Sequence, residues 1–139
     1  METKETKLLI HTDGACSGNP GPMGAGVYIT KDEKVVDMIS EYLGKGTNNT
    51  AELTAIDIAL EKAIFYNEKN VELRADSEWC VKVLNNQYRC KQKHLLAILK
   101  KIKEKQPFFT SLKFIWIPRE KNEVANELAT AAVANRFKK

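Results

Sequence analysis

Apolar and polar residues repeat along this chain with two different periods. Five short runs rich in apolar and β-branched residues predict strands, at residues 7–13, 24–30, 35–43, 71–76 and 112–117. Four longer stretches carry apolar residues at helical spacing and predict helices, at residues 50–66, 77–86, 94–105 and 122–137. The segments 14–22 and 44–49 are rich in turn-forming residues and are predicted loops.

The order of these elements predicts an α/β protein built on a mixed sheet. The first three strands follow one another with short connections, which favours an antiparallel meander. Later strands alternate with helices, which favours parallel additions and helices on the faces of the sheet. A length of 139 residues fits one domain, so we expect a single domain over residues 1–139 with flexible ends at 1–6 and 137–139.

Composition excludes several classes of protein. Hydrophobic residues make up 43% and charged residues 29% of the chain, which is typical of a folded globular protein. The longest strictly apolar runs, 95–99 and 131–134, are far shorter than the roughly 18 residues that cross a membrane. The polar start is unlike a secretory signal, and the three cysteines form no Cys-x-x-Cys pair. We therefore predict a cytoplasmic monomer without membrane association.

Positive charge is concentrated in one segment. The net charge is +4, and most of the excess falls within residues 89–105, where Glu104 is the one acid among six lysines and one arginine. Two interpretations stay open for this basic segment: a solvated helix face, or a patch that contacts phosphate groups.

Three acidic residues fall where a sheet of this kind places a ligand site. Asp13 ends the first predicted strand, Asp76 ends the fourth, and Glu52 lies in the first turn of the first long helix. Parallel strands bind ligands at their carboxyl ends, so Asp13 and Asp76 share an edge if their strands are neighbours. Glu52 projects into the apolar arc of its helix, where an uncompensated charge is costly. A divalent cation would supply the missing partner.

Each of these positions also has a structural interpretation. Asp13 could form a turn with Gly14, Asp76 could be a helix N-cap, and Glu52 could close a capping box with Asn49. Asn126 lies at the rim of the buried arc predicted for the last helix, where it could reach the end of the sheet or face solvent. The arc itself comprises Val124, Ala125, Leu128, Ala129, Ala132 and Val133.

Four segments resemble the sequence motifs of type 1 ribonuclease H. Residues 12–22 (TDGACSGNPGP) resemble the opening motif, 47–53 (TNNTAEL) the second, 75–77 (ADS) the third and 122–129 (NEVANELA) the fourth. The motifs occur in the family's order and spacing and cover nearly the whole chain. The resemblance implies a ribonuclease H-like fold, with a five-stranded mixed sheet flanked by helices.

The resemblance also implies an activity, the endonucleolytic hydrolysis of the RNA strand of RNA–DNA hybrids, leaving 5′-phosphate and 3′-hydroxyl ends. It implies two Mg²⁺ ions, with Mn²⁺ as a substitute, and hard oxygen ligands suit both. Two such cations can clamp the attacking and departing oxygens of an in-line displacement. By position, Asp13 would bridge both ions, Glu52 and Asp76 would hold the ion on the leaving-group side, and Asn126 would hold the ion that delivers water.

The same motifs imply substrate contacts in the minor groove of the hybrid, where the 2′-hydroxyl distinguishes RNA from DNA. An asparagine amide can donate to and accept from that hydroxyl. Double-stranded RNA is a further candidate substrate. The residues predicted to contact nucleic acid are Gly14, Ala15, Cys16, Asn19, Asn48, Asn49, Ser77 and Arg119.

Asn126 departs from the family pattern, which has Asp at this position. An amide oxygen can coordinate a cation but brings no negative charge, so we expect the ion beside the attacking water to be held more weakly and activity to be impaired. A non-hydrolytic hybrid-binding module is the alternative function. A transposase- or integrase-type domain is a third hypothesis, although its acids would be expected in the order Asp, Asp, Glu, whereas Glu52 precedes Asp76 here.

Overall fold

A computed structural model describes residues 6–137 and contains a five-stranded mixed sheet. The strands are β1 (Leu8–Cys16), β2 (Gly21–Lys31), β3 (Lys34–Gly46), β4 (Asn70–Ala75) and β5 (Ser111–Trp116), in the spatial order β3-β2-β1-β4-β5. The pairs β1–β2 and β2–β3 are antiparallel, whereas β1–β4 and β4–β5 are parallel. The sequence-based expectation of an antiparallel meander followed by parallel additions is confirmed.

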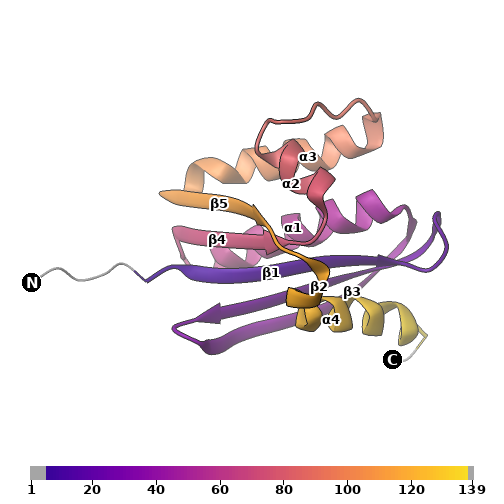
Figure 1. The fold of residues 1–139 in the computed structure, drawn as a ribbon, viewed down its shortest axis with the longest axis horizontal. Coiled ribbons are helices and arrows are strands. Elements are labelled where there is room, and N and C mark those ends of the chain that lie inside the picture. The colour runs from indigo at the N-terminus through magenta and orange to yellow at the C-terminus, as the bar shows by residue number, and fades with distance from the viewer. Residues whose placement is uncertain (1–5, 138–139) are drawn as a thin grey trace, which may run out of the picture.

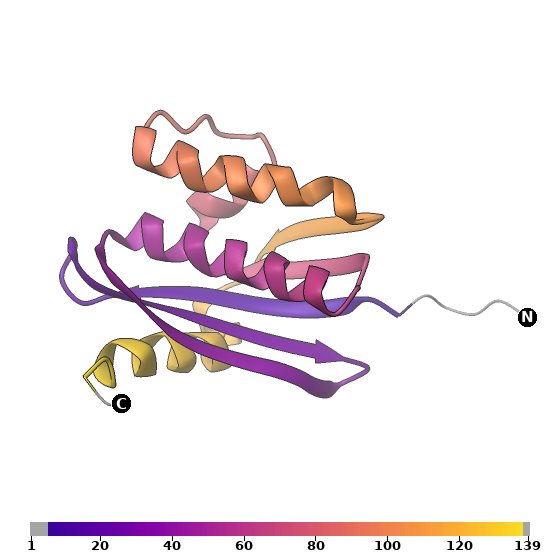
Figure 2. The same cartoon turned by 180° about the vertical axis from the view of Figure 1, so that it is seen from behind.

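Helices cover both faces of this sheet (Figures 1 and 2). They are α1 (Asn48–Phe65), α2 (Glu78–Leu84), α3 (Lys93–Lys105) and α4 (Glu123–Ala134), with short 3₁₀ turns at Gln106–Phe108 and Arg119–Lys121. Figures 1 and 2 show α1, α2 and α3 on one side of the sheet and α4 alone on the other. Within residues 6–137, no helix combines the length and the apolar character that crossing a membrane requires.

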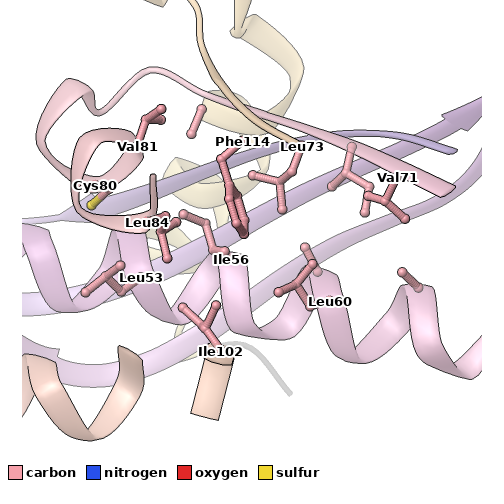
Figure 3. Packing of buried hydrophobic residues seen from close by; sticks show 14 of the residues in the cluster. Leu53, Ile56, Leu60, Val71, Leu73, Cys80, Val81, Leu84, Ile102 and Phe114 are labelled. Atoms are coloured by element: carbon pink, nitrogen blue, oxygen red, sulfur yellow. The ribbon is translucent and has the colours of Figure 1, made fainter. Parts of the chain in front are cut away.

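The main core lies between the sheet and the three helices on its first face (Figure 3). Alternate residues of each strand point toward these helices, so Ile10 of β1 and Leu73 of β4 are fully buried. Leu53 and Ile56 of α1 contribute from the facing helix, and Ile102 of α3 packs beside them. This packing fixes the axis of α1 relative to the carboxyl ends of β1 and β4.

Two glycines let α4 approach the opposite face of the sheet closely. A Cβ atom at Gly26 would overlap the carbonyl oxygen of Ala125, and one at Gly24 would overlap that of Ala129. Gly26 is paired in register with Asp13 of β1. The close approach therefore carries the first half of α4 to the side of Asp13.

Several predicted boundaries are wrong, and the largest error concerns the predicted loop at 14–22. β1 continues through Gly14 to Cys16, so Asp13 and Gly14 form no turn, and residues 17–20 alone connect β1 to β2. Gly14 is needed inside the strand because a side chain there would overlap the backbone of α1 at Ala51. The predicted loop at 44–49 likewise shrinks, because β3 ends at 46 and α1 begins at 48.

The last helix is shorter than its sequence predicts, and its buried face comprises fewer residues. It ends at Ala134, where Asn135 forms the C-cap, rather than at 137. Val124, assigned to the buried arc, is 38% exposed because it lines a cavity with His11 and Tyr28 instead of packing against the sheet. The predicted flexible ends fall largely in 1–5 and 138–139, which lie outside the described residues.

Candidate functional site

The three predicted acids meet at one end of the sheet. Asp13 lies in β1, Asp76 directly follows β4, and Glu52 lies on α1. Thr12 and Ala75 are paired across the parallel strands β1 and β4, so the acids that follow them lie side by side. Each carboxylate offers one oxygen, and these three oxygens lie within 4.8 Å of one another. The predicted convergence of the three side chains is therefore confirmed.

Helix α1, which carries Glu52, begins at Asn48, two residues earlier than its sequence predicts. The N-cap is Thr47, whose Oγ1 accepts a hydrogen bond from the backbone N–H of Thr50 (3.3 Å). The alternative of a capping box between Asn49 and Glu52 is therefore wrong, and Glu52 lies in the second turn rather than the first. Its side chain turns toward the sheet.

The carboxylate of Glu52 lacks a compensating partner. The residue is 8% exposed, and its Oε2 atom is buried without a hydrogen bond. A buried carboxylate in that condition costs several kcal/mol when it is ionised, whereas a divalent cation would balance it. The orphaned oxygen and the two adjacent carboxylates together fit a site for a hard cation that prefers oxygen ligands.

Asp76 is free of the capping role that was its structural alternative. The N-cap of α2 is Ser77, whose Oγ accepts from the backbone N–H of Cys80 (3.3 Å). The N-cap interpretation of Asp76 is therefore wrong. The hydroxyl of Ser77, a residue predicted to contact nucleic acid, caps this helix beside the acidic cluster.

Asn122 is a site residue that sequence analysis missed. Its side chain is 1% exposed, and its Nδ2 donates both to the carbonyl oxygen of Thr12 (2.8 Å) and to Oδ2 of Asp76 (3.0 Å). The residue stands immediately before α4, so one amide joins β1, the end of β4 and α4. Nothing in the local pattern distinguishes it from an ordinary helix N-cap, because both partners are distant in sequence.

Replacing Asn122 with Ala should destabilise the protein by about 2 kcal/mol, because the carbonyl of Thr12 would stay buried without its donor. Urea denaturation monitored by circular dichroism measures the change. Asn135→Ala at the exposed opposite end of α4 is the matched control and should have a small effect. Equal stability of the two variants would contradict the bridging role.

Asn126 lies beside the acids, as the resemblance to type 1 ribonuclease H implies. It is half-buried on α4, and its Nδ2 donates to Oδ2 of Asp13 (2.8 Å). The amide therefore stabilises the charge of Asp13 in the arrangement described here. Asp13 also accepts the backbone N–H of Gly14 (3.0 Å), so its two oxygens have different partners.

Electrostatics in this cluster favours protonation of Glu52 when no cation is bound. Burial is the main cause that raises the pKa of Glu52 well above its usual range, and the neighbouring carboxylates of Asp13 and Asp76 add to it. Burial also raises the pKa of Asp76, while the hydrogen bond from Asn122 and the charge of Arg119 oppose that rise. A cation that binds here would displace a proton from Glu52.

The raised pKa of Glu52 gives a testable pH dependence. Above pH 4.5 the glutamate ionises in the unfolded chain but stays protonated in the folded one, so stability falls as the pH rises from there through the folded-state pKa. Glu52→Gln removes this loss. In EDTA, we expect the variant to melt at a higher temperature than the parent at pH 8 and at a similar temperature at pH 4, measured by calorimetry.

Glu61→Gln provides the matched control, because Glu61 lies on the same helix with a 71% exposed side chain. It should leave the pH profile of the melting temperature unchanged. If the melting temperature of Glu52→Gln depends on pH as that of the parent does, ionisation of Glu52 does not destabilise the folded protein.

A pocket of about 590 Å³ surrounds the carboxylates. Asn48 and Arg119 line it as predicted, and so do the backbone positions 14–16. Thr130 of α4 and Arg136, which lies just after that helix, also line the pocket, and the sequence analysis did not single them out. Both arginines bring positive charge to the rim of an acidic pocket, an arrangement that suits a phosphate group bound next to a cation.

A smaller cavity of about 330 Å³ adjoins the start of α1. It is lined by the predicted residues Asn19, Asn48 and Asn49, and the backbone N–H of Asn48 donates to Oδ1 of Asn19 (3.0 Å). Gln92 also lines this cavity, although it lies just before α3 in a segment without a recognisable pattern. Amide side chains from three separate segments thus gather on one surface.

The cations of the basic segment 89–105 do not share one face. Lys105 forms ion pairs with Asp57 (2.7 Å) and Glu61 (3.4 Å) of α1, so it joins two helices. Arg89, Lys100 and Lys103 instead line a separate groove against α3. Lys105 is therefore no part of either a solvated face or a phosphate-contacting patch.

Known proteins are similar to this chain in sequence over most of its length. A family model described as "Reverse transcriptase-like" matches residues 11–132. Ribonuclease HI of Halobacterium salinarum is 34% identical over 128 residues, which cover 91% of this chain and 64% of that protein. A bifunctional protein of Mycobacterium tuberculosis is 30% identical over 129 residues, which cover 91% of this chain. The chain spans only 35% of the length of that relative.

Solved structures share the fold over almost the whole chain. The crystal structure of RNase H1 from Halobacterium salinarum superposes with a TM-score of 0.89 at 30% identity, covering 93% of this chain and 98% of that one. The structure of LC11-RNase H1 in complex with an RNA/DNA hybrid superposes with a TM-score of 0.89 at 37% identity, covering 95% and 100%.

Proposed function

This chain belongs to the type 1 ribonuclease H family, and on that premise we propose that it hydrolyses the RNA strand of RNA–DNA hybrids with two divalent metal ions. The observation that carries the proposal is the convergence of Asp13, Glu52 and Asp76 within 4.8 Å, with a buried oxygen of Glu52 left without a partner. The structure of LC11-RNase H1 with a bound hybrid supports the choice of substrate.

Each ligand residue has a separate part in this proposal. Asp13 would be a ligand of both ions, Glu52 and Asp76 would hold the ion on the leaving-group side, and Asn126 would hold the other. Mg²⁺ is the expected ion, with Mn²⁺ as a substitute. When bound, the two ions supply charge stabilisation for the attacking and leaving oxygens and lower the pKa of the attacking water.

The protein's own groups prepare the site for that chemistry. Asn122 orients the carboxylate of Asp76 by donating to its Oδ2, so this ligand does not need to be ordered on binding. Glu52 releases its proton as cations bind, so site assembly depends on pH. Arg119 contributes positive charge near Asp76, where a substrate phosphate can accept hydrogen bonds from its guanidinium.

Recognition of the hybrid is assigned to the amide-rich surface beside the carboxylates. Asn19, Asn48 and Asn49 can each donate to or accept from a 2′-hydroxyl, and Gln92 can do the same. Gly14 brings the backbone close to the α1 terminus, where a larger residue would overlap Ala51. Attack of water on a phosphorus atom of the RNA strand would break the P–O3′ bond, so one product keeps the new 5′-phosphate and the departing O3′ takes up a proton to become a 3′-hydroxyl.

A second candidate function is non-hydrolytic binding of the same hybrid. The observation that favours it is Asn126, which provides an amide rather than a fourth carboxylate and donates a hydrogen bond to Asp13. A module that kept the amide-rich surface but could not hold both ions would bind hybrids and leave them uncut.

One experiment separates the two functions. A hybrid labelled at the 5′ end of its RNA strand is incubated with the protein in Mg²⁺, Mn²⁺ or EDTA, and binding and cleavage are measured in parallel. We expect cleavage products with 3′-hydroxyl ends in either metal and none in EDTA. Saturable binding without cleavage in both metals would establish the binding module, and the absence of binding would overturn both functions. Double-stranded RNA in the same assay tests the further candidate substrate.

A further inference from the structure

Another cavity, which is separate from the carboxylate pocket, lies along α3. It encloses about 880 Å³ between the end of α2, the α2–α3 connection and the side of α3 that faces away from α1, and we call it the α3 groove. Figures 1 and 2 show the connection passing along α3, on the side of the sheet opposite α4. None of its lining residues belongs to the carboxylate pocket.

The α3 groove presents apolar surface to solvent. Leu99 is buried at its floor, whereas Leu96 and Tyr88 on its sides are 44% and 49% exposed. Leu95, the neighbour of Leu96 on α3, is fully buried in the main core, whereas Leu96 lies about 100° further around the helix and is exposed. Tyr88 is held in place by Lys82, whose Nζ lies 3.4 Å from the phenol oxygen and 5.0 Å from the ring centroid.

Positive charge surrounds this apolar surface. Arg89, Lys100 and Lys103 line the groove, with Glu104 as the opposing acid. Across residues 6–137, none of these three cations takes part in an ion pair, whereas Lys105 on the same helix is paired with Asp57. The cations of the groove therefore keep their capacity to bind an anionic partner.

We propose that the α3 groove docks an acidic amphipathic peptide segment of a partner protein. Apolar side chains of the segment would pack against Leu96 and Tyr88, and its carboxylates would pair with Lys100 and Lys103. A peptide fits better than a nucleic acid, because grooves for single strands combine cations with several stacked aromatic rings, whereas Tyr88 is the one aromatic residue that lines this groove. The proposal does not depend on hybrid cleavage.

A fluorescent peptide tests the proposal directly. The probe is a labelled peptide of about 12 residues with leucine and phenylalanine at helical spacing and glutamate elsewhere, titrated with the protein at about 0.1 M salt. We expect saturable binding by fluorescence anisotropy with a Kd of about 100 μM or tighter. Replacing the apolar residues of the probe with serine should weaken binding at least tenfold, because the carboxylates alone then remain.

Charge reversal distinguishes the groove from the rest of the surface. The double variant Lys100→Glu/Lys103→Glu should bind the acidic probe at least tenfold more weakly and should bind a lysine-containing version of the probe more tightly than the parent does. Lys101→Glu is the matched control, since Lys101 is exposed on the same helix but does not line the groove. It should change neither affinity by more than about twofold.

Three outcomes would overturn the proposal. The first is a lack of saturable probe binding at about 1 mM protein. The second is an equal loss of probe affinity in the double variant and in Lys101→Glu, and the third is displacement of the probe by a short DNA strand. The salt dependence of hybrid affinity provides the remaining readout. A flatter slope in the double variant would assign these lysines to phosphate contacts instead, whereas an unchanged slope supports a separate peptide site.

Discussion

Asp13→Asn is expected to lower the rate of hybrid cleavage by at least about a thousandfold. Asp13 lies between Asn126 and the other two acids, and it is the ligand assigned to both ions. A cation at such a site stabilises the transition state by several kcal/mol, and about 4 kcal/mol corresponds to a thousandfold change in rate. Single-turnover cleavage of a labelled hybrid at saturating Mg²⁺ measures the loss.

The control for this variant is Asp32→Asn in the exposed turn between β2 and β3. Asp32 has a positive φ of 52°, a conformation that asparagine also adopts, so the exchange leaves the fold intact. It should cleave at the parent rate. An Asp13→Asn protein that keeps more than about a tenth of the parent rate would show that Asp13 is no metal ligand in the reaction. Because the Asp13→Asn protein is expected to be almost inactive, its preparation also sets the upper limit on cleavage by any contaminating nuclease.

Asn126→Asp is expected to raise the cleavage rate at saturating Mg²⁺ by about tenfold or more. The negative charge around the two ions would come from three carboxylates and one substrate phosphate, because Asn126 adds a neutral amide. A carboxylate at position 126 would hold the ion beside the attacking water more strongly. An additional transition-state stabilisation of about 1.4 kcal/mol gives the tenfold change. Parallel titrations of Mg²⁺ for the two proteins separate tighter ion binding from faster chemistry.

The same substitution has a second readout that does not depend on cleavage. Asp at position 126 would remove the donor to Asp13 and place a further negative charge beside it. The Asn126→Asp protein should therefore melt at a lower temperature than the parent in EDTA at pH 8 and gain more on addition of Mg²⁺. Equal cleavage rates in saturating Mg²⁺, together with equal melting shifts, would contradict the role given to position 126.

The sequence predicted the type and order of the strands and longer helices because their cores follow simple periods. The boundaries failed where glycine carried a structural role that composition alone hides. Gly14 was predicted to lie in a loop, yet it lies inside β1 because the backbone of α1 packs against it. Only the three-dimensional packing of α1 distinguishes this glycine from one in a turn.

The site was predictable to a similar extent. Asp13 and Asp76 were predictable from their places on adjacent parallel strands, although β1 continues past Asp13 to Cys16. Glu52 was predictable from its place on the apolar side of a helix. Their capping alternatives failed because Thr47 and Ser77, residues equally suited to capping, occupy the N-cap positions.

Asn122 and Gln92 escaped prediction for a different reason. Asn122 donates a hydrogen bond to a backbone carbonyl 110 positions away in sequence. Gln92 lines the same cavity as Asn19, Asn48 and Asn49 only because α3 is placed beside the start of α1. Contacts of this kind leave no local periodicity or motif. They become visible only once the elements are assembled.

Anomalous X-ray diffraction from crystals soaked in Mn²⁺ tests the central claim most directly, since it locates bound cations without relying on activity. We predict at least one peak about 2.1 Å from carboxylate oxygens of Asp13, Glu52 and Asp76. In Glu52→Gln crystals that peak should weaken or vanish. Peaks confined to other parts of the surface, or none in crystals whose carboxylates remain clustered, would contradict a metal centre at this end of the sheet.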